Sequence, residues 1–185
     1  MRLVQPSDTV FEQALYASSR ADLQALGLPA PLLQTLLAQQ QQAQAHGMAL
    51  HYPQAQRWVI EEKADNDACP LGRVVLCELA EPQPHLRILD LAVLPGAQRQ
   101  GIAMGVLRAV QASAQAANLA LRLAVAHSNL GAQALYRKAG FLPDLPNSPD
   151  SAAATPSTPA PAPDALLLQM HWKPVVTLEA HRAKH

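Results

Sequence analysis

The sequence of 185 residues is poor in aromatic side chains and in charge. Phe, Trp and Tyr make up 4% of it and charged residues 15%, whereas hydrophobic residues make up 49%. A hydrophobic core can therefore form, but it must be aliphatic and rich in alanine, and wholesale disorder is excluded. The 14 Lys and Arg residues balance the 14 Asp and Glu residues. Because nucleic-acid binders usually carry a basic excess, we expect no DNA or RNA partner.

The sequence also lacks long apolar runs and a cysteine framework. No stretch reaches the roughly 20 apolar residues of a transmembrane helix, and the N-terminal residues show no signal-peptide pattern. Cys69, which we expect in a polar loop, and Cys77, in an apolar run, are the two cysteines. They exclude a disulfide framework and a four-cysteine zinc site. We therefore expect a cytoplasmic protein with no bound metal and no membrane partner.

Proline is the exception, with 16 residues against 8 glycines. Seven of the 16 prolines lie between Leu142 and Asp164, in a Pro- and Ala-rich segment that cannot bury enough apolar surface to become ordered. Residues 166–172 follow it with the pattern of a buried strand. We predict one domain over residues 1–175, with a flexible loop over 142–164 inserted before the last strand, and a C-terminal tail over 176–185.

Hydrophobic periodicity and turn residues predict the secondary structure. The expected helices span residues 9–18, 31–47, 101–117 and 130–139. The expected strands span residues 3–4, 58–61, 73–78, 86–94, 121–125 and 166–172. Antiparallel strands precede a β-α-β-α crossover, which predicts a mixed, mostly antiparallel α/β sheet flanked by helices. We interpret the glutamine run 39–44 as the solvated face of a helix.

A short loop joins the strand that ends at Pro95 to the helix that begins at Gly101. It carries one basic residue, Arg99, and small residues follow at Ala103 and Gly105. Amides in the first turn of a helix lack intrahelical partners, and small residues permit close approach, so the pattern is typical of a pyrophosphate-binding loop. The alternative is an ordinary strand-to-helix turn in which Gly and Ala serve tight packing.

The chain carries three spaced motifs, namely the strand 89–95, the loop with Gln98, Gly101 and Ala103, and Asn129 with residues 134–141. Together they resemble motifs of the GNAT superfamily of acetyl-CoA-dependent N-acyltransferases. The family's loop, Gln/Arg-x-x-Gly-x-Gly/Ala, is matched by Gln98, Gly101 and Ala103. Residues 89–95 look like its central strand, and Asn129 with residues 134–141 is similar to its Asn…Ala-x-x-Leu-Tyr-x-x-x-Gly-Phe motif. The resemblance implies a single GNAT-like domain, a monomer or homodimer, that moves the acetyl group of acetyl-CoA to a primary amine by direct attack in a ternary complex.

The resemblance also implies where acetyl-CoA is held. Backbone groups near Leu91, Ala92 and Val93 would hold the acyl and pantetheine portion. The residues that would cradle the pyrophosphate are Gln98, Arg99, Gln100, Gly101, Ile102, Ala103 and Met104. Asn129 would meet the cofactor at the start of the next helix, where it can also act as an N-cap. Tyr136 would contact the cofactor and, as general acid, protonate the leaving thiolate; a core tyrosine is the alternative.

The sequence does not decide which side chain acts as the general base. Some relatives carry an acidic residue on the strand before the motif asparagine, but residues 120–126 contain none. Asp90 is our candidate base, and a purely structural Asp90 is the alternative. Other side chains that could accept the proton are Glu61, Glu78 and His127. The acceptor amine is also open, and the alternative function is a non-catalytic CoA-binding sensor or an interaction module on the same fold.

Overall fold

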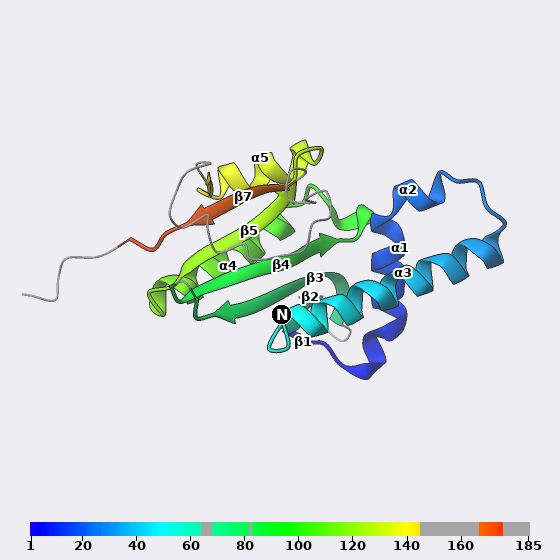
Figure 1. Cartoon of the computed structure of the whole chain (residues 1–185), viewed down its shortest axis with the longest axis horizontal. Helices are drawn as coiled ribbons and strands as arrows, with labels where there is room; N and C mark the ends of the chain where they lie inside the picture. Colours follow the sequence, from blue (N-terminus) through cyan, green and yellow to red (C-terminus); the bar gives the residue numbers. More distant parts are fainter. Residues whose placement is uncertain (64–67, 82, 145–166, 176–185) are drawn as a thin grey trace, which may run out of the picture. The chain divides into compact units, whose positions relative to one another are not determined.

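The computed structural model describes residues 1–63, 68–81, 83–144 and 167–175 (Figure 1). Within these ranges, seven strands form one sheet in the order β1-β2-β3-β4-β5-β7-β6. The strands are β1 (Arg2–Leu3), β2 (Gln56–Lys63), β3 (Ala68–Leu79), β4 (His85–Val93), β5 (Ala120–Ala126), β6 (Leu142–Pro143) and β7 (Leu167–Trp172). The helices are α1 (Thr9–Ser19), α2 (Ala21–Gln24), α3 (Ala30–His51), α4 (Ile102–Ala116) and α5 (Leu130–Lys138). The predicted mixed, mostly antiparallel α/β sheet is confirmed.

The chain divides into two compact units. The first comprises Met1–Cys77 and Leu89–Ala103, and the second comprises Glu78–Ile88 and Met104–His185. In the first unit, β1, β2 and β3 form an antiparallel ribbon whose β2–β3 register shifts between Ile60 and Glu61, as at a β-bulge. The buried side chains of this unit include Leu15, Tyr16, Val59, Ile60, Val74 and Val75. They come from α1 and from both faces of the ribbon.

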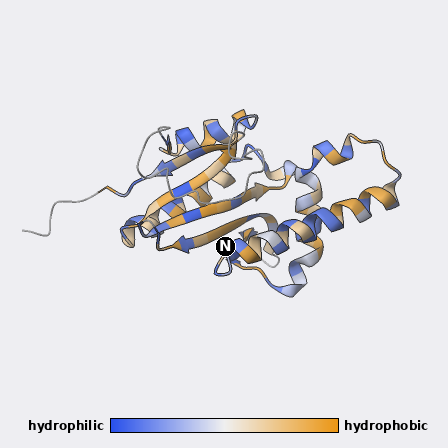
Figure 2. Ribbon diagram, viewed as in Figure 1, coloured by the Kyte–Doolittle hydropathy of each residue, from blue (hydrophilic) through white to orange (hydrophobic). Residues whose placement is uncertain are grey.

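Helix α3 is longer than the sequence predicts. It begins at Ala30, continues through Gly47 and ends at His51. A glycine inside a helix costs only about 1 kcal/mol relative to alanine, and the surrounding Ala, Gln and Leu residues favour helix. Within this fully described helix no residue is buried, although α3 packs beside α1. Figure 2 shows its hydrophobic residues mainly in the N-terminal half. No helix of the described residues is long and apolar enough to cross a bilayer.

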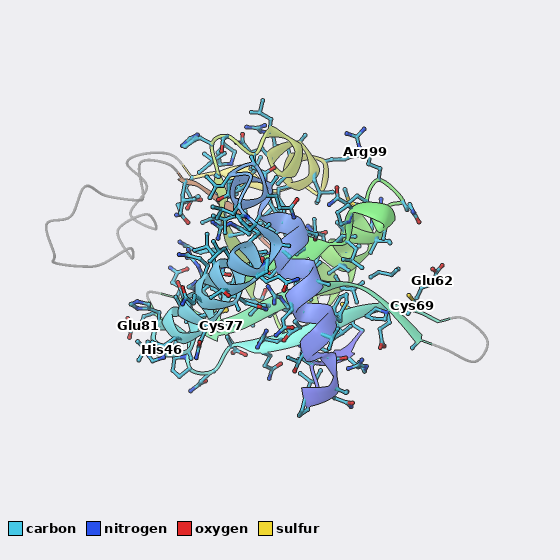
Figure 3. All side chains as sticks on the ribbon, turned by 90° about the vertical axis from the view of Figure 1, so that its right-hand side faces the viewer. His46, Glu62, Cys69, Cys77, Glu81 and Arg99 are labelled. Carbon is cyan, nitrogen blue, oxygen red and sulfur yellow. The ribbon has the colours of Figure 1, made fainter. Side chains whose placement is uncertain are left out.

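Strand β3 begins earlier than predicted, at Ala68 instead of Arg73. Cys69 therefore lies in a strand, opposite Glu62 of β2, and the polar loop predicted for it is wrong (Figure 3). Cys69 is exposed, whereas Cys77 is buried. A two-stranded antiparallel ribbon can extend beyond the core, and there its residues need not be apolar. Residues 64–67, between β2 and β3, lie outside the described residues.

In the second unit, β5 supplies the clearest strand pattern. Alternate side chains are buried at Leu121, Leu123 and Val125, as expected for a period of two. β5 pairs in parallel with residues 85–88 of β4 and antiparallel with β7. Helix α4 buries an aliphatic stripe made of Val106, Leu107, Val110 and Ala114. The predicted aliphatic character of the core is confirmed for β5 and α4, while the aromatic side chains of Tyr136 and Phe141 are also buried in this unit.

Two short elements are missing from the predicted order. β6 occupies Leu142–Pro143, the start of the segment predicted to be a loop, and pairs antiparallel with β7. The backbone N–H of Asp144 donates to the carbonyl oxygen of Gln169 at 2.9 Å and continues this pairing. Helix α2 has four residues. Neither element is long enough to show a hydrophobic period. The rest of the predicted loop, from residue 145, and the tail 176–185 lie outside the described residues.

Candidate functional site

The segment after β4 forms a short loop that leads into α4. A 3₁₀ turn, η2 (Pro95–Ala97), follows the strand. The side-chain amide of Gln98 donates to the carbonyl oxygen of Val93 at 2.9 Å, and that of Gln100 donates to the carbonyl oxygen of Gly96 at 3.0 Å. These bonds fold the loop back on itself. The two glutamine side chains, predicted to meet the cofactor, therefore hold the loop in shape.

Two residues of this loop have a left-handed backbone. The φ angle is 62° at Arg99 and 83° at Gly101. Glycine adopts this conformation freely, whereas a residue with a side chain pays about 1 kcal/mol or more. Arg99 is exposed on the outside of the loop (Figure 3). Non-glycine residues in such conformations concentrate at binding and catalytic sites, which favours a binding role for this loop.

The small residues at the start of α4 are not required by packing. Among the described residues, no atom lies within 4 Å of the position that a Cβ would take on Gly101 or Gly105. The tight-packing explanation for these two glycines is therefore wrong. Their outward faces leave room for a ligand to approach the backbone at the beginning of the helix, where N–H groups lack intrahelical partners.

The end of β4 holds Leu91, Ala92 and Val93, all of which are half-buried. The parallel ladder with β5 extends from His85 to Ile88, and β4 continues from there to Val93. On the β3 side, a Cβ on Gly72 would collide with the carbonyl oxygen of Ala92. Glycine at position 72 is thus what allows β3 to approach β4 at this point.

Asn129 acts as the N-cap of α5. Its side-chain oxygen accepts a hydrogen bond from the backbone N–H of Ala132 at 3.0 Å. Gln133, which no sequence motif indicated, is 5% exposed and donates to the carbonyl oxygens of Ala126 and His127 at 3.0 and 2.9 Å. This buried amide fastens the first turn of α5 to the end of β5. The N-cap role expected for Asn129 is confirmed, while its cofactor contact stays a prediction.

Tyr136 is buried near the end of α5, with 8% of its surface exposed. Its ring meets the ring of Phe141 edge to face, with 5.8 Å between the centroids. The chain reverses between them at Gly140, where φ is 86°, and the N–H of Phe141 donates to the carbonyl oxygen of Tyr136 at 3.0 Å. The helix end and the aromatic pair together fix the position of the tyrosine ring.

Asp90 belongs to a chain of ion pairs within the first unit. Its Oδ2 accepts from Arg73 Nη2 at 2.8 Å and from Nε at 3.1 Å. Glu12 Oε1 lies 3.4 Å from Arg73 Nη1 and 2.5 Å from Arg57 Nη2. Burial opposes the charge of Arg73, but the carboxylates of Asp90 and Glu12 outweigh it and raise the pKa of Arg73. Asp90 thus has a structural partner, which the sequence left open.

Glu61, another candidate base, belongs to a different ion pair of the first unit. Glu61 Oε1 accepts from Arg2 Nε at 2.7 Å. Arg2 also pairs with Asp8, whose pKa falls to about 2 through that pairing and through the N–H of Gln5. Glu78 and His127 are exposed. Within the described residues, no three His, Cys, Asp or Glu side chains gather as a metal site.

A cavity of about 500 Å³ lies in the first unit and was not predicted. Its walls come from α1, from α3, from residues 52–55 and from the ribbon of β2 and β3. Gln41, Gln42 and Gln44 line it, and Gln41 Nε2 donates to the backbone oxygen of Glu12 at 3.3 Å. The solvated helix face predicted for the glutamine run is confirmed at Gln42 and Gln44, which are exposed, whereas Gln41 is half-buried. Spacing within one helix could not reveal a wall shared by four elements.

Comparisons with known proteins match the chain to one family. A family model described as the acetyltransferase (GNAT) family matches residues 20–141. No curated protein sequence matches. Among the similar solved structures is the PaiA N-acetyltransferase of Thermoplasma acidophilum in complex with coenzyme A, with 15% identity, coverage of 93% of this chain and 96% of that one, and a TM-score of 0.57.

Two further structures give the same result. A GNAT-family acetyltransferase of Staphylococcus aureus has 14% identity, covers 92% of this chain and 96% of its own, and has a TM-score of 0.58. A chimera of spermidine N-acetyltransferase SpeG from Vibrio cholerae and hSSAT has 19% identity, covers 93% of both chains and has a TM-score of 0.53. At these identities the likeness shows a shared fold.

Proposed function

Because the chain belongs to the GNAT acetyltransferase family, we propose that it moves the acetyl group of acetyl-CoA to a primary amine by direct attack in a ternary complex. The loop from Gln98 into α4, with its outward-facing glycines, is the observation that carries this proposal. The amine nitrogen forms a bond to the acetyl carbon, and the bond from that carbon to sulfur breaks. The amine loses a proton to a base and the thiolate gains one from an acid, which gives an N-acetyl amine and coenzyme A.

Residues 98–104 are proposed to bind the pyrophosphate of acetyl-CoA. The unpartnered N–H groups and the dipole at the start of α4 favour an anion there. The exposed guanidinium of Arg99 can add charge-assisted hydrogen bonds. A side chain at Gly101 or Gly105 would fill the space above this turn, so the residues present suit a phosphate. The shared fold with PaiA, a structure in complex with coenzyme A, supports acetyl-CoA as donor.

Backbone groups of Leu91, Ala92 and Val93 are proposed to hold the acyl and pantetheine portion. The parallel ladder of β4 ends at Ile88, three residues before this stretch. Where a strand continues beyond its ladder, its backbone N–H and C=O groups can form hydrogen bonds with an elongated ligand, in the way that they would pair with an additional strand. The support therefore comes from the course of β4 itself.

Tyr136 is proposed as the general acid and as a cofactor contact, and Asn129 as a second contact. A phenolic O–H can donate its proton to a departing thiolate, and a thiolate leaves more readily when protonated. The edge-to-face contact with Phe141 supports this role, since a proton donor must be held in one position. Asn129 marks the start of the same helix and can present its amide N–H₂ while its oxygen caps the turn.

Asp90 is proposed as the general base, with Glu61, Glu78 and His127 as the other candidates. The two bonds from Arg73 engage Oδ2 of Asp90, so the proton would be taken up on Oδ1, directly or through water. With 27% of the Asp90 side chain exposed, water can reach the carboxylate. We further propose residues 1–175 as the acetyltransferase domain, residues 176–185 as a tail, and a monomer or homodimer as the assembly.

Two measurements test the proposed function. Acetyl-CoA should raise the midpoint of thermal unfolding, because a ligand that binds the native state stabilises it. A panel of primary amines should then release coenzyme A, detected with a thiol reagent. Stabilisation without coenzyme A release from any amine would favour a non-catalytic CoA-binding sensor. Absence of stabilisation would contradict acetyl-CoA as donor.

A further inference from the structure

The cavity of the first unit contains three charged side chains. Glu12, Arg57 and Arg73 line it together with glutamines and with Tyr16 and Tyr52. Its volume of about 500 Å³ lies in the range of small-molecule sites. Glu12 and Arg73 each have 11% of the side chain exposed, whereas Arg57 has 40% exposed. Arg57 is thus the charged side chain most open to a ligand.

The charges of the network decide which ligand can bind. Each carboxylate has a guanidinium partner, since Asp90 pairs with Arg73 and Glu12 pairs with Arg57 and Arg73. A polyamine requires carboxylates whose charge is not already compensated, and the cavity wall supplies none among the described residues. Among those same residues, the side chain of Arg57 donates to Glu12 alone, through Nη2. A guanidinium has five N–H donors, so most of those of Arg57 remain for a ligand.

The ion pairs also connect the cavity to the strand of the proposed acyl site. Arg73 lines the cavity and contacts Asp90 of β4. Ala92 follows Asp90 by two residues on the same strand, a distance of about 7 Å along an extended chain. Arg73 therefore links the wall of this cavity to the strand that would hold the acyl group.

We propose that this cavity binds the acceptor and that the acceptor is an amine with a carboxylate, of the amino-acid class, whose carboxylate pairs with Arg57. The inference rests on the proposed acetyl transfer and adds the class of acceptor to it. An arginine fork suits a carboxylate because it can donate two parallel hydrogen bonds. The glutamine side chains of α3 offer both donors and acceptors to the rest of the ligand.

Direct binding tests the inference without relying on turnover. The proteinogenic L-amino acids are titrated by calorimetry into the full chain with coenzyme A present. The best of them is compared with its decarboxylated counterpart, for example L-leucine with isopentylamine or L-phenylalanine with phenethylamine, and with spermidine. We expect the amino acid to bind at least about tenfold more tightly than the matched amine, because the charge-assisted pair is lost with the carboxylate.

The variants separate recognition from folding. Arg57→Gln should weaken the binding of the amino acid by about tenfold or more, and the difference in affinity between the amino acid and the matched amine should become smaller. Arg57→Lys should recover part of the lost affinity. Lys173→Gln removes one exposed positive charge outside the cavity and should leave the affinity unchanged. Thermal stabilisation by acetyl-CoA reports that each variant is folded.

Three outcomes would overturn the inference. No amino acid binds, or spermidine or the decarboxylated amine binds as tightly as the amino acid, or Arg57→Gln weakens the binding of the amino acid and of the matched amine by the same factor. Release of coenzyme A with polyamines but with no amino acid would support the proposed acetyl transfer and contradict an acceptor that carries a carboxylate. If an amino acid binds in an Arg57-dependent way but no coenzyme A is released, the proposed acetyl transfer is contradicted and the carboxylate-binding site is supported.

Discussion

The guanidinium of Arg73 donates two hydrogen bonds to one oxygen of Asp90, at 2.8 and 3.1 Å, and so joins β3 to β4 through side chains. Immediately before Arg73, Gly72 lies so close to β4 that a Cβ would meet the carbonyl oxygen of Ala92. Backbone approach and ion pair thus occur at adjacent positions. Both should be sensitive to substitution.

Replacing Arg73 with methionine should lower the free energy of unfolding by roughly 3 kcal/mol, because the change leaves a partly buried carboxylate without its guanidinium. Urea denaturation followed by circular dichroism measures the loss. Arg108→Met is the matched control: Arg108 lies exposed on α4, so the loss of its guanidinium should cost much less. Equal losses of unfolding free energy in the two variants would show that the Arg73–Asp90 pair contributes no more to stability than an exposed arginine does.

Gly72→Ala should destabilise the protein by about 1–3 kcal/mol, since the new methyl group forces β3 away from β4. Gly47→Ala is the opposite case, because Gly47 lies inside α3 and a Cβ there meets no described atom within 4 Å. That change should stabilise by about 1 kcal/mol through helix propensity. Thermal melts of the two variants should therefore shift in opposite directions, and a shift in the same direction would refute the expectation.

Gly101→Glu should abolish the thermal stabilisation by acetyl-CoA, because it places a bulky negative charge where the pyrophosphate is proposed to bind. Gly101→Ala separates strain from charge: at φ 83° it costs about 1 kcal/mol of stability but adds no charge. Gly96→Glu adds the same charge in η2, away from the first turn of α4, and should keep most of the stabilisation. Full stabilisation of Gly101→Glu would remove this loop from the cofactor site.

Tyr136→Phe should lower kcat by about 10²–10³-fold while acetyl-CoA still stabilises the protein. The substitution keeps the ring that packs against Phe141 and removes the hydroxyl proposed as the acid. Initial rates and thermal shifts of the same preparation give both quantities. If kcat stays within about twofold of the wild type, Tyr136 is a core residue and another group protonates the thiolate.

Stability should depend on His85 at mildly acidic pH. Burial, with smaller contributions from Arg122 and Arg87, lowers the pKa of His85 from 6.5, and the carbonyl oxygen of Gln83 opposes this only in part. As the pH falls through 6.5, the unfolded chain takes up a proton at this residue that the folded chain does not, so the free energy of unfolding decreases. His85→Gln should flatten that decrease in urea titrations at pH 7, 6 and 5. An unchanged slope would contradict it.

Much of the fold follows from patterns that lie within one element. β5 alternates buried Leu121, Leu123 and Val125 with half-buried positions, and α4 repeats its apolar residues at helical spacing. Such periods are set by the local geometry of the strand and the helix, and they can therefore be recognised in the sequence. The N-cap at Asn129 and the turn at Gly140 are local in the same way. The same holds for the loop motif of Gln98, Gly101 and Ala103.

Other features depend on segments that are far apart in the chain. The end of α3 beyond Gly47, the start of β3 at Ala68 and the partner of Asp90 all depend on neighbours from other elements. The cavity of the first unit is the clearest case, because Glu12, Gln41 and Arg57 come from three elements and meet only when these pack together. The sequence alone thus determined the family motifs and the local elements. The tertiary structure decided which charges meet, because that depends on distances across the fold.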